Sequence, residues 1–549
     1  MTKIRARLSA ETAVVRPKPA AKLRIALAYP NTYRVGISSL GYQIVYRLFN
    51  ALPDVSCERV FLPDPTDLRE YLRTGMKLFS LETQTPVADF DVLAFSLAFE
   101  LDYVNALRIL ELSGIPLYAF QRSERHPLVI AGGVCATFNP EPMADFVDCF
   151  VIGDAENVVA RLANTLITTA GQDKADRLAA LAKIEGIYVP SFYTPEYGKD
   201  GSLVSMKAGY PAPVDVKRSV CCDLSSHPGD SVIITAESEF GAARLVEVER
   251  GCGRGCRFCV TGYINRPPRL RDLEAYLQHS ASFNATQRYG LVGSAVFDHP
   301  DAVHFCRQLL AHNLSFSVAS LRLETVTQEV ASLLAASGQK TLTIAPEAGT
   351  ERLRRVIGKA CFDEQIDHVV NNARRAGLER VRLYFMIGLP TESEHDIDSI
   401  ATLTGELAGK YYDLDFEVSV SSFVPKPWTP FQWHPMAKES TLRNRLLRLR
   451  KALQRIPNVN LSAESPRLSV VQGLLARGDR RLSRMLELAV QYEGDYRAAL
   501  RDSQIDLDWY IYRHRDQHEV FPWDHIVVDI DKDWLWREYQ RALTASAGV

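Results

Sequence analysis

Three cysteines within eight residues constrain this 549-residue chain more than any other feature of its sequence. Cys252, Cys256 and Cys259 lie in the run Glu-Arg-Gly-Cys-Gly-Arg-Gly-Cys-Arg-Phe-Cys that begins at Glu249. This spacing allows three thiolates to bind one iron–sulfur cube and leaves the fourth iron without a protein ligand. An iron with a free coordination position can react, whereas a fully ligated cluster mainly stores or transfers electrons. We therefore expect these cysteines to be metal ligands at a catalytic centre.

A zinc knuckle, or a chance set of buried thiols, is the alternative interpretation of this run. A closed zinc site needs a fourth cysteine or histidine at short spacing. The next histidine is His279, twenty residues after Cys259. The glycines at positions 251, 253 and 255 also suit a loop that curls tightly around a cluster, because glycine adopts positive φ at little cost. The sequence therefore favours the iron–sulfur cluster.

The run resembles the signature of the radical S-adenosylmethionine (radical SAM) enzymes, in which an aromatic residue precedes the third cysteine. That residue is Phe258 here, and we expect it to contact the cofactors. The resemblance implies a 4Fe–4S cluster that binds S-adenosylmethionine at its open iron. Reductive cleavage would give methionine and a 5′-deoxyadenosyl radical, which takes a hydrogen atom from the substrate. An electron donor of the flavodoxin or ferredoxin type is implied as a partner.

Length and composition describe an ordinary globular protein. The chain is long enough for two or three domains, and its hydrophobic and charged fractions are 46% and 24%. A formal net charge of -2 gives no clear signature of nucleic-acid binding. No apolar run is long enough to span a bilayer, and the N-terminus lacks the apolar stretch of a secretory signal. We therefore expect a cytoplasmic location. The seven other cysteines support this expectation, because they form no disulfide-like framework.

The N-terminal part of the chain alternates between apolar strands and helical patterns. A basic segment at residues 1–22, which we expect to be a flexible tail, comes first. Strands are then expected at residues 23–29, 91–97, 128–131 and 149–152. This alternation predicts an α/β fold with a parallel sheet, whose ligands bind at the carboxyl ends of the strands. We assign residues 23–160 to a Rossmann-like domain and residues 161–243 to a helical and irregular linker.

This region resembles the cobalamin-binding domain that precedes the catalytic core in one large subclass of radical SAM enzymes. The resemblance implies cobalamin contacts from the loops that follow the strands, at Asn31, Tyr33, Gly36, Ser96, Leu97, Gly132, Gly133 and Gly153. The usual motif Asp-x-His-x-x-Gly, which supplies the lower cobalt ligand, has no histidine here. Bound cobalamin would therefore lack a histidine lower ligand. The alternative is a doubly wound domain that kept this fold without the ligand.

A second series of strands begins immediately before the cysteine loop. The expected strands cover residues 244–249, 289–296, 314–321, 340–345, 380–387 and 416–424, with helices between them. Six such units predict a partial (β/α)6 barrel similar to a TIM barrel, with its chemistry at the carboxyl ends of the strands. We assign residues 244–436 to this radical SAM core and residues 437–549 to a mainly helical C-terminal domain.

The ends of three barrel strands match positions where the superfamily usually binds S-adenosylmethionine. Ser320 and Arg322 follow the third strand, and Glu347 follows the fourth, where its carboxylate can accept bonds from hydroxyl or ammonium groups. Met386, Gly388 and Pro390 lie at the end of the fifth strand, in a segment that resembles the adenine-contacting one. The alternative for each position is packing at the barrel rim or capping of a helix.

The resemblance favours cobalamin-dependent methylation of an unactivated carbon. Rearrangement, cyclisation or oxidation without methyl transfer is the first alternative, and an iron–sulfur or cobalamin sensor is a second. Methylthiotransfer is disfavoured, because that group uses a second cluster on an N-terminal cysteine-rich domain, and Cys57, Cys135 and Cys149 lack comparable spacing. His525 and Asp524, in a C-terminal Phe-Pro-Trp-Asp-His-Ile run, are acid–base candidates, although an interdomain histidine is the more common case. Nothing in the sequence identifies the substrate.

Overall fold

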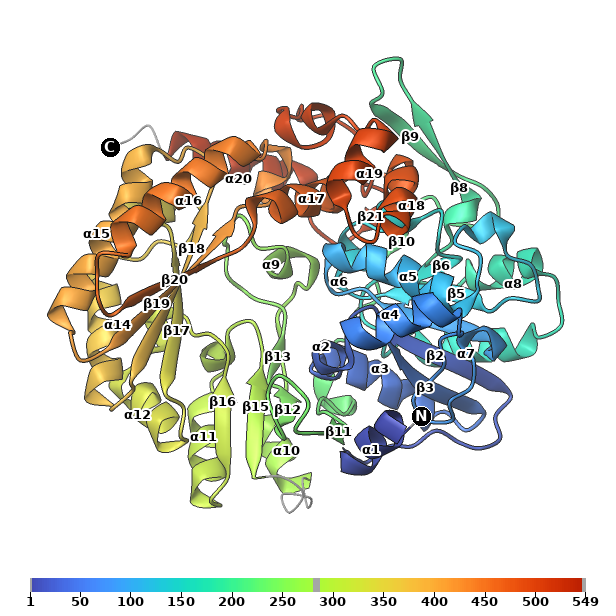
Figure 1. Ribbon diagram of the computed structural model, residues 1–549, viewed down its shortest axis with the longest axis horizontal. Coiled ribbons are helices and arrows are strands. Elements are labelled where there is room, and N and C mark those ends of the chain that lie inside the picture. Colours follow the sequence, from blue (N-terminus) through green and yellow to red (C-terminus); the bar gives the residue numbers. More distant parts are fainter. Residues whose placement is uncertain (1, 280–286, 546–549) are drawn as a thin grey trace. The chain divides into compact units, whose positions relative to one another are not determined.

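The protein is described by a computed structural model that covers residues 2–279 and 287–545 and has two compact units (Figure 1). The N-terminal unit comprises Met1–Arg244, Leu475–Asp506 and His518–Val528. The barrel unit comprises Leu245–Leu474, Leu507–Gln517 and Asp529–Val549. The division at Arg244 coincides with the expected start of the catalytic core. The C-terminal region differs from expectation, because it is shared between the two units and forms no separate domain.

A six-stranded sheet forms the centre of the N-terminal unit, in the order β3-β2-β4-β5-β6-β7. The strands are β2 (Leu23–Tyr29), β3 (Val55–Phe61), β4 (Val92–Ser96), β5 (Leu128–Gly132), β6 (Cys149–Val151) and β7 (Ile187–Tyr188). The first five are parallel, and β7 pairs antiparallel with β6. The strand order reverses between β2 and β4, which is where open α/β sheets bind their ligands. The doubly wound fold expected for this region is present.

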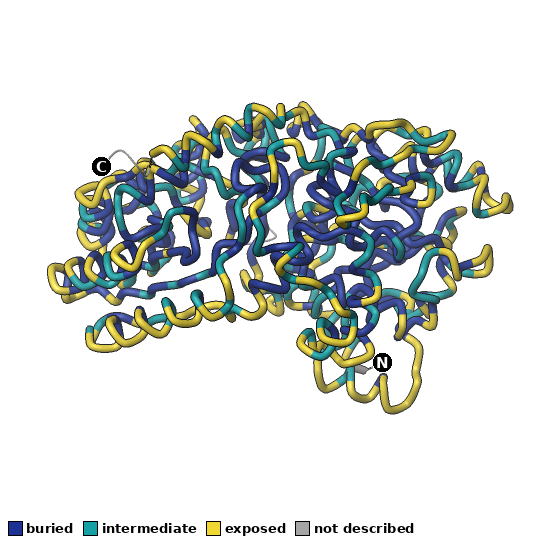
Figure 2. Tube along the Cα trace, turned by 90° about the horizontal axis from the view of Figure 1, so that it is seen from above, coloured by how far each residue is buried: buried dark blue, intermediate teal, exposed yellow. Residues whose placement is uncertain are grey.

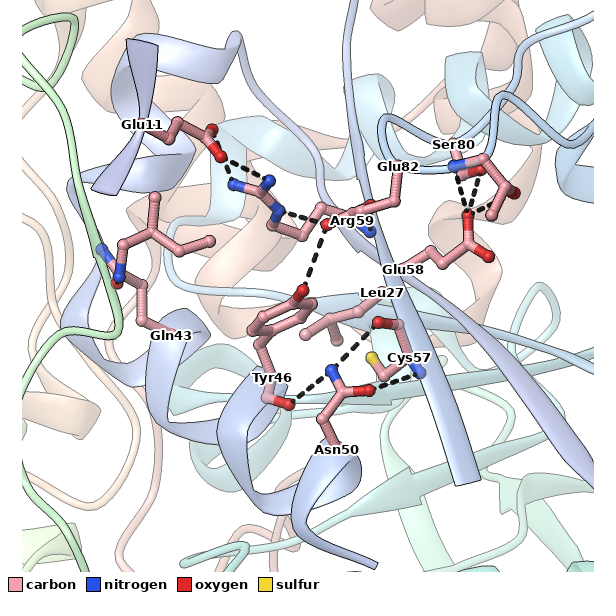
Figure 3. Close-up of polar contacts among 12 residues, drawn as sticks. Glu11, Leu27, Gln43, Tyr46, Asn50, Cys57, Glu58, Arg59, Ser80 and Glu82 are labelled. Atoms are coloured by element: carbon pink, nitrogen blue, oxygen red, sulfur yellow. Dashed lines mark hydrogen bonds and ion pairs between the residues drawn. The ribbon is translucent and has the colours of Figure 1, made fainter. Parts of the chain in front are cut away.

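Strand β3 has no counterpart among the expected strands, because two charged residues interrupt its apolar pattern. Glu58 and Arg59 are nevertheless buried, at 2% relative exposure each. The carboxylate of Glu58 accepts hydrogen bonds from Ser80 Oγ at 2.6 Å and from Thr83 Oγ1 at 2.7 Å. Figure 3 shows the contact between Glu58 and Ser80 next to those of Arg59. A strand whose buried charges have hydrogen-bond partners fits the sheet. Its polar sequence, however, lacks the apolar pattern by which strands are predicted.

The guanidinium of Arg59 joins two carboxylates from distant segments (Figure 3). It donates to both oxygens of Glu11, at 2.9 and 2.8 Å, and to Oε1 of Glu82 at 2.6 Å. Glu11 lies within residues 1–22, where a flexible tail was expected. The structure differs, because α1 (Thr2–Ala10) precedes Glu11 and β1 (Thr12–Ala13) pairs with β11 (Ile233–Ile234). A buried ion pair therefore holds this segment to the sheet.

Helices cover the sheet and extend the N-terminal unit into the expected linker. Short helices α2 (Tyr33–Ile37) and α6 (Val134–Phe138) follow β2 and β5, and longer ones are α3 (Leu40–Ala51), α4 (Pro65–Thr74), α5 (Tyr103–Ser113), α7 (Val159–Thr168) and α8 (Lys174–Leu181). The side chains of α3 and α7 share one buried core with β2 and β3. The segment at residues 161–243, expected to be helical and irregular, also contains β7, the hairpin of β8 (Tyr193–Tyr197) and β9 (Leu203–Ala208), and β10 (Val216–Lys217).

Two C-terminal segments complete the N-terminal unit. They contain α18 (Ser483–Gln491), α19 (Tyr496–Ser503) and β21 (Ile526–Val527), which pairs with β10. Tyr118 donates to the carboxylate of Glu487 on α18 at 3.0 Å. Asn139 donates to the carbonyls of Ala476 and Gly478 at 3.0 and 2.9 Å. Polar groups of the C-terminal segments therefore form hydrogen bonds with polar groups of the N-terminal segment in this unit.

The two main sheets of the barrel unit contain the six expected strands and one more. They are β12 (Arg244–Glu247), β15 (Arg288–Val292), β16 (Ser315–Val318), β17 (Thr341–Glu347), β18 (Arg380–Ile387), β19 (Asp415–Ser422) and β20 (Val459–Ala463). A bridge between Leu321 and Ile344 connects the sheet β12-β15-β16 to the sheet β17-β18-β19-β20. The additional strand, β20, pairs parallel to β19 and lies in a region that was expected to be mainly helical. Only Val459 of this strand is buried, so its apolar signal is weak.

Helices alternate with these strands, as in a (β/α) barrel. They are α10 (Leu273–His279), α11 (Ala302–Ala311), α12 (Gln328–Ala336), α13 (Glu351–Val356), α14 (Asp363–Arg375), α15 (Glu394–Lys410) and α16 (Glu439–Leu453). Helix α17 (Pro466–Arg477) follows β20, and α20 (Lys532–Thr544) is the last helix of the described residues. Buried residues, dark blue in Figure 2, occur throughout the described chain. Among the described residues, no helix combines the length and apolar character needed to cross a bilayer.

Candidate active site

The cysteine loop begins where the first barrel strand ends. Strand β13 (Glu249–Arg250) pairs with β14 (Arg269–Leu270), and the loop starts at Gly251 with φ +88°. A Cβ atom at Gly251 would lie 2.3 Å from the carbonyl oxygen of Asn265, so only glycine fits there. A Cβ atom at Gly255, by contrast, would meet nothing within 4 Å. The loop is therefore anchored at its first residue and has open space further along.

The three thiols lie in this loop at intermediate exposure. Burial raises the pKa of Cys256, and the positive charges of Lys359 and Arg322 oppose this shift. Burial likewise raises the pKa of Cys259. Within the described residues, no three thiols, imidazoles or carboxylates already converge as a metal site. The donor set still fits an iron–sulfur cluster, because three accessible thiols share one loop and two cations lie close enough to offset negative charge there. Phe258, between the second and third cysteines, is also partly exposed.

Lys359 and Glu347 form an ion pair beside the cysteine loop. The ammonium of Lys359 lies 3.0 Å from Oε1 of Glu347, and the two side chains are 15% and 14% exposed. The preceding Gly358 packs directly on the loop, since a Cβ atom there would lie 2.6 Å from the carbonyl oxygen of Gly255. Glu347 has φ +70°, a conformation that non-glycine residues adopt rarely and that is found disproportionately at functional sites. The structure thus places the Glu347 carboxylate, predicted as a ligand contact, next to the cysteine loop.

A buried carboxylate that the sequence did not mark as functional lies at the start of β13. Glu249 is 5% exposed and accepts a hydrogen bond from the backbone N–H of Ala295. Burial raises its pKa, whereas the N–H groups of Ala295 and Ser294 oppose that shift. A Cβ atom at Gly293 would come 2.7 Å from Cγ of Glu249. Glu249 therefore fixes the backbone of the loop after β15. The Gly-Ser-Ala sequence of this loop was the sequence feature that could have indicated this contact.

The residues after β16 differ in accessibility. Ser320 is exposed, and the Arg322 side chain is 15% exposed. The guanidinium of Arg322 lies 4.0 Å from Asp298 and 3.4 Å from Glu324. Arg254, inside the cysteine loop, also donates to Asp298 at 2.9 Å. Asp298 therefore links the loop to the predicted ligand contact Arg322.

At the end of β18, the predicted adenine-contacting residues are largely enclosed by protein. Met386, Gly388 and Pro390 are all buried. Gly388 has φ +87°, and a Cβ atom there would lie 2.7 Å from Cδ2 of Leu442 on α16. Close packing against α16 therefore accounts for this glycine, so the adenine contact stays a prediction. The N–H of Gly388 donates to Oε2 of Glu392 at 2.6 Å, which fixes the turn.

The loops predicted to contact cobalamin have both accessible and buried residues. Asn31, Ser96, Gly132 and Gly153 are partly exposed, and Gly133 is exposed. Tyr33, Gly36 and Leu97 are buried. The hydroxyl of Tyr33 donates to Oε1 of Glu11 at 2.5 Å, so it is already used inside the protein. The accessible positions lie at the carboxyl edge of the sheet, whereas the buried ones contribute to the packing of the domain.

Several of these loop residues have partners within the chain. Asn31 Nδ2 donates to Oδ1 of Asp102 at 2.9 Å, which joins the loops after β2 and β4 where the strand order reverses. Burial raises the pKa of Asp102 to about 6. Gly133 has φ +111°, and a Cβ atom there would lie 2.6 Å from the Leu97 carbonyl oxygen. The glycine pattern therefore follows partly from close contacts between loops.

Family models match both units. Residues 246–404 match the radical SAM superfamily, and residues 41–190 match the N-terminal domain of radical SAM proteins. Together with the three-cysteine loop at the start of a partial barrel, these matches place the chain in the radical SAM superfamily.

Relatives with similar sequences fall into two groups. An uncharacterized protein of Methanocaldococcus jannaschii, MJ0966, is 28% identical over 509 residues, which is 92% of this chain and 98% of that protein. A tRNA-2-methylthio-N(6)-dimethylallyladenosine synthase of Vibrio vulnificus is 22% identical over 239 residues, and the match covers 39% of this chain and 47% of the enzyme. The chain thus matches the first relative over nearly its full length and the second over about half.

The solved structures that match this chain include two of TsrM, a radical S-adenosylmethionine methyltransferase from Kitasatospora setae. The structure of TsrM with cobalamin and a [4Fe-4S] cluster has a TM-score of 0.49 and 14% identity, over 76% of each chain. Its complex with tryptophan and a SAM analogue has a TM-score of 0.47 and 15% identity, over 74% of each chain.

Proposed function

We propose that this radical SAM protein reductively cleaves S-adenosylmethionine and uses the resulting radical for cobalamin-dependent methylation of an unactivated carbon. The observation that carries the first part is the loop in which Cys252, Cys256 and Cys259 lie beside the Lys359–Glu347 pair. These three thiolates would hold a 4Fe–4S cluster, which when bound would supply the electron for cleavage of a carbon–sulfur bond of S-adenosylmethionine. An external flavodoxin or ferredoxin is the expected electron donor.

The protein's own groups position the ligand and balance its charge. Lys359 and Arg322 offset the negative charge of three thiolates, which is otherwise costly at partly buried positions. Glu347 accepts hydrogen bonds from a hydroxyl or ammonium group of the ligand. Glu249 fixes the backbone after β15 at a neighbouring strand end, where the ligands of β/α barrels bind. These roles require groups on several different strands, as in other barrel enzymes.

The second part of the proposal assigns cobalamin to the N-terminal unit. Its support is the carboxyl edge of the sheet, where Asn31, Ser96, Gly132, Gly133 and Gly153 reach the surface. Cobalamin, if held there, would supply the methyl group. The loop after β2 contains no histidine, and the Tyr33 hydroxyl is engaged by Glu11. We therefore propose that the loops at this edge would hold cobalamin without a histidine ligand from the loop after β2.

One observation favours a second candidate, radical chemistry without methyl transfer. Tyr33, Gly36 and Leu97 of the predicted cobalamin set are buried in the domain's own packing. A domain that kept the fold without the cofactor would show the same burial. A sensor that uses the cluster without turnover is a third possibility and predicts no cleavage of S-adenosylmethionine.

The test uses full-length protein purified without oxygen and supplied with iron, sulfide, a strong reductant and hydroxocobalamin. We expect about four irons per chain, bound corrinoid, and 5′-deoxyadenosine that depends on reductant. Cys256→Ala should abolish deoxyadenosine formation, whereas Cys222→Ala, which alters an exposed thiol, should not. Zinc in place of iron, or iron without cleavage, would refute the first part. Cleavage without retained corrinoid would favour the second candidate.

A further inference from the structure

Helix α20 contacts the cysteine loop. Its Glu538 accepts hydrogen bonds from Nε and Nη2 of Arg257, at 3.3 and 3.1 Å. Arg257 is the residue between Cys256 and Phe258, and its side chain is 14% exposed, against 16% for Glu538. A charge-assisted pair with this degree of burial is stronger than a surface ion pair, because solvent screens it less.

Arg257 is also bonded to the chain on its other side. Its Nη1 donates to the carbonyl oxygens of Arg355 and Val356, at 3.0 and 2.9 Å, and its backbone N–H donates to Ile357 at 2.9 Å. These carbonyls lie at the C-terminal end of α13, which favours a positive charge. One side chain therefore fixes the cysteine loop between the end of α13 and the middle of α20.

A second contact of α20 reaches the same loop through Arg266. The guanidinium of Arg266 lies 5.7 Å from the ring of Trp534 on α20 and 5.1 Å from that of Tyr263, which is within range for cation–π attraction. Nη2 of Arg266 donates to the carbonyl oxygen of Arg254, between Cys252 and Cys256, at 3.2 Å. Helix α20 therefore supports the loop at two points, one on each side of Cys256.

Aromatic packing holds α20 in place on the barrel unit. Trp433 packs against Trp536 and Tyr539, with ring centroids 5.1 and 6.3 Å apart. The Tyr539 hydroxyl lies 3.0 Å from Nδ1 of His434. Trp433 is fully buried, so its contacts with Trp536 and Tyr539 fix the position of α20 on the barrel unit.

We propose that α20 is a positioning element for the iron–sulfur cluster, with Glu538 as the positioning residue that orients the cysteine loop through Arg257. This inference rests on the cluster proposed above. Groups that orient metal ligands through hydrogen bonds typically change metal affinity or activity 10- to 100-fold when they are mutated. The C-terminal residues of the chain thus act on the cofactor without contacting it.

The experiment compares Glu538→Gln with Arg537→Gln in the reconstituted full-length protein. Arg537 is 58% exposed and lies on the same helix, where it faces Asp531 at 3.7 Å. We expect Glu538→Gln to lose iron to a chelator about 10- to 100-fold faster than the parent and to change the electron paramagnetic resonance signal of the reduced cluster. Arg537→Gln should do neither, and both variants should unfold at the parent's temperature.

A double-mutant cycle separates positioning from general destabilisation. If Glu538 acts through Arg257, the double variant Arg257→Gln/Glu538→Gln should lose iron no faster than Arg257→Gln alone. Additive rates, or a parent-like rate for Glu538→Gln, would overturn the inference. If Glu538→Gln fails to fold, the rate of iron loss is measured in Trp534→Leu instead, which removes the contact between α20 and Arg266. A parent protein that binds no iron would instead refute the proposed function itself.

Discussion

Single buried charges determine much of the stability of the N-terminal unit. Arg59→Met would leave the carboxylates of Glu11 and Glu82 without their shared cation, and Glu11 is only 2% exposed. Removing one partner of a buried ion pair costs about 3–5 kcal/mol, because the other charge stays desolvated. We expect urea-induced unfolding, followed by circular dichroism, to show a loss of this size. The matched control is Arg73→Met, whose pair with Glu70 is exposed and should change stability by less than about 1 kcal/mol. Equal effects of both substitutions would contradict the assigned role of Arg59.

At the cysteine loop, the charge of Lys359 should tune the proposed cluster. Reduction adds negative charge, which the ammonium beside Cys256 stabilises. Lys359→Met should therefore lower the midpoint potential of the cluster at unchanged iron content. A redox titration monitored by electron paramagnetic resonance measures this. Lys340→Met is the control, because Lys340 is 70% exposed and pairs with Glu379. An unchanged potential in the Lys359 variant would exclude the role.

At the scale of elements, we expect the stability of the contact between the β18 turn and α16 to depend on pH. Burial raises the pKa of Glu392 to about 7, against an ordinary 4.5, while Arg445 opposes the shift and Asp396 adds to it. A carboxyl with a raised folded-state pKa stabilises the fold most when it is protonated, so this contribution is lost as pH rises from about 4.5 to about 7. The change amounts to about 3 kcal/mol.

Glu392→Gln should remove this dependence. The free energy of unfolding of the parent, relative to the variant, should fall across that pH range in urea titrations. Glu394→Gln, at an exposed carboxylate that also faces Arg445, should leave the dependence in place. A constant difference between the parent and Glu392→Gln would show that the carboxyl does not titrate there.

Elements with clear apolar periodicity could be predicted from the sequence, and those with buried charges or short edges could not. The strands β2, β4 and β18 each contain an apolar run of four or more residues, so their positions were expected. Strand β3 contains Glu58 and Arg59, whose partners come from distant segments that local patterns do not reveal. Edge strand β20 exposes most of its residues and has little apolar signal. The cysteine loop was identifiable because its chemistry lies in one short run, whereas Lys359 and Glu538 join it only through the fold.

At the scale of the whole molecule, sequence order misleads about which parts fold together. Residues 475–506 and 518–528 belong to the N-terminal unit, although they follow the barrel in the chain. Their main polar connection is Arg480, which donates to both oxygens of the fully buried Glu141, at 2.9 and 3.1 Å, and to the Tyr188 hydroxyl at 3.1 Å. His525 is buried beside them, with Nε2 3.9 Å from Glu141. This histidine, an acid–base candidate in the sequence, therefore lies inside the unit, and burial lowers its pKa.

This connection gives a prediction for the full-length chain. Arg480→Met should destabilise the N-terminal unit by about 3–5 kcal/mol, because the Glu141 carboxylate is left buried without a cation. Adding Glu141→Gln should restore part of the loss, since it removes the uncompensated charge. Urea unfolding of the two variants, with Arg484→Met at an exposed pair as control, measures both effects. If the double variant were less stable than Arg480→Met, the uncompensated buried charge would not be the cause of the lost stability. The packing of the C-terminal segments in the N-terminal unit would then depend on apolar contacts alone.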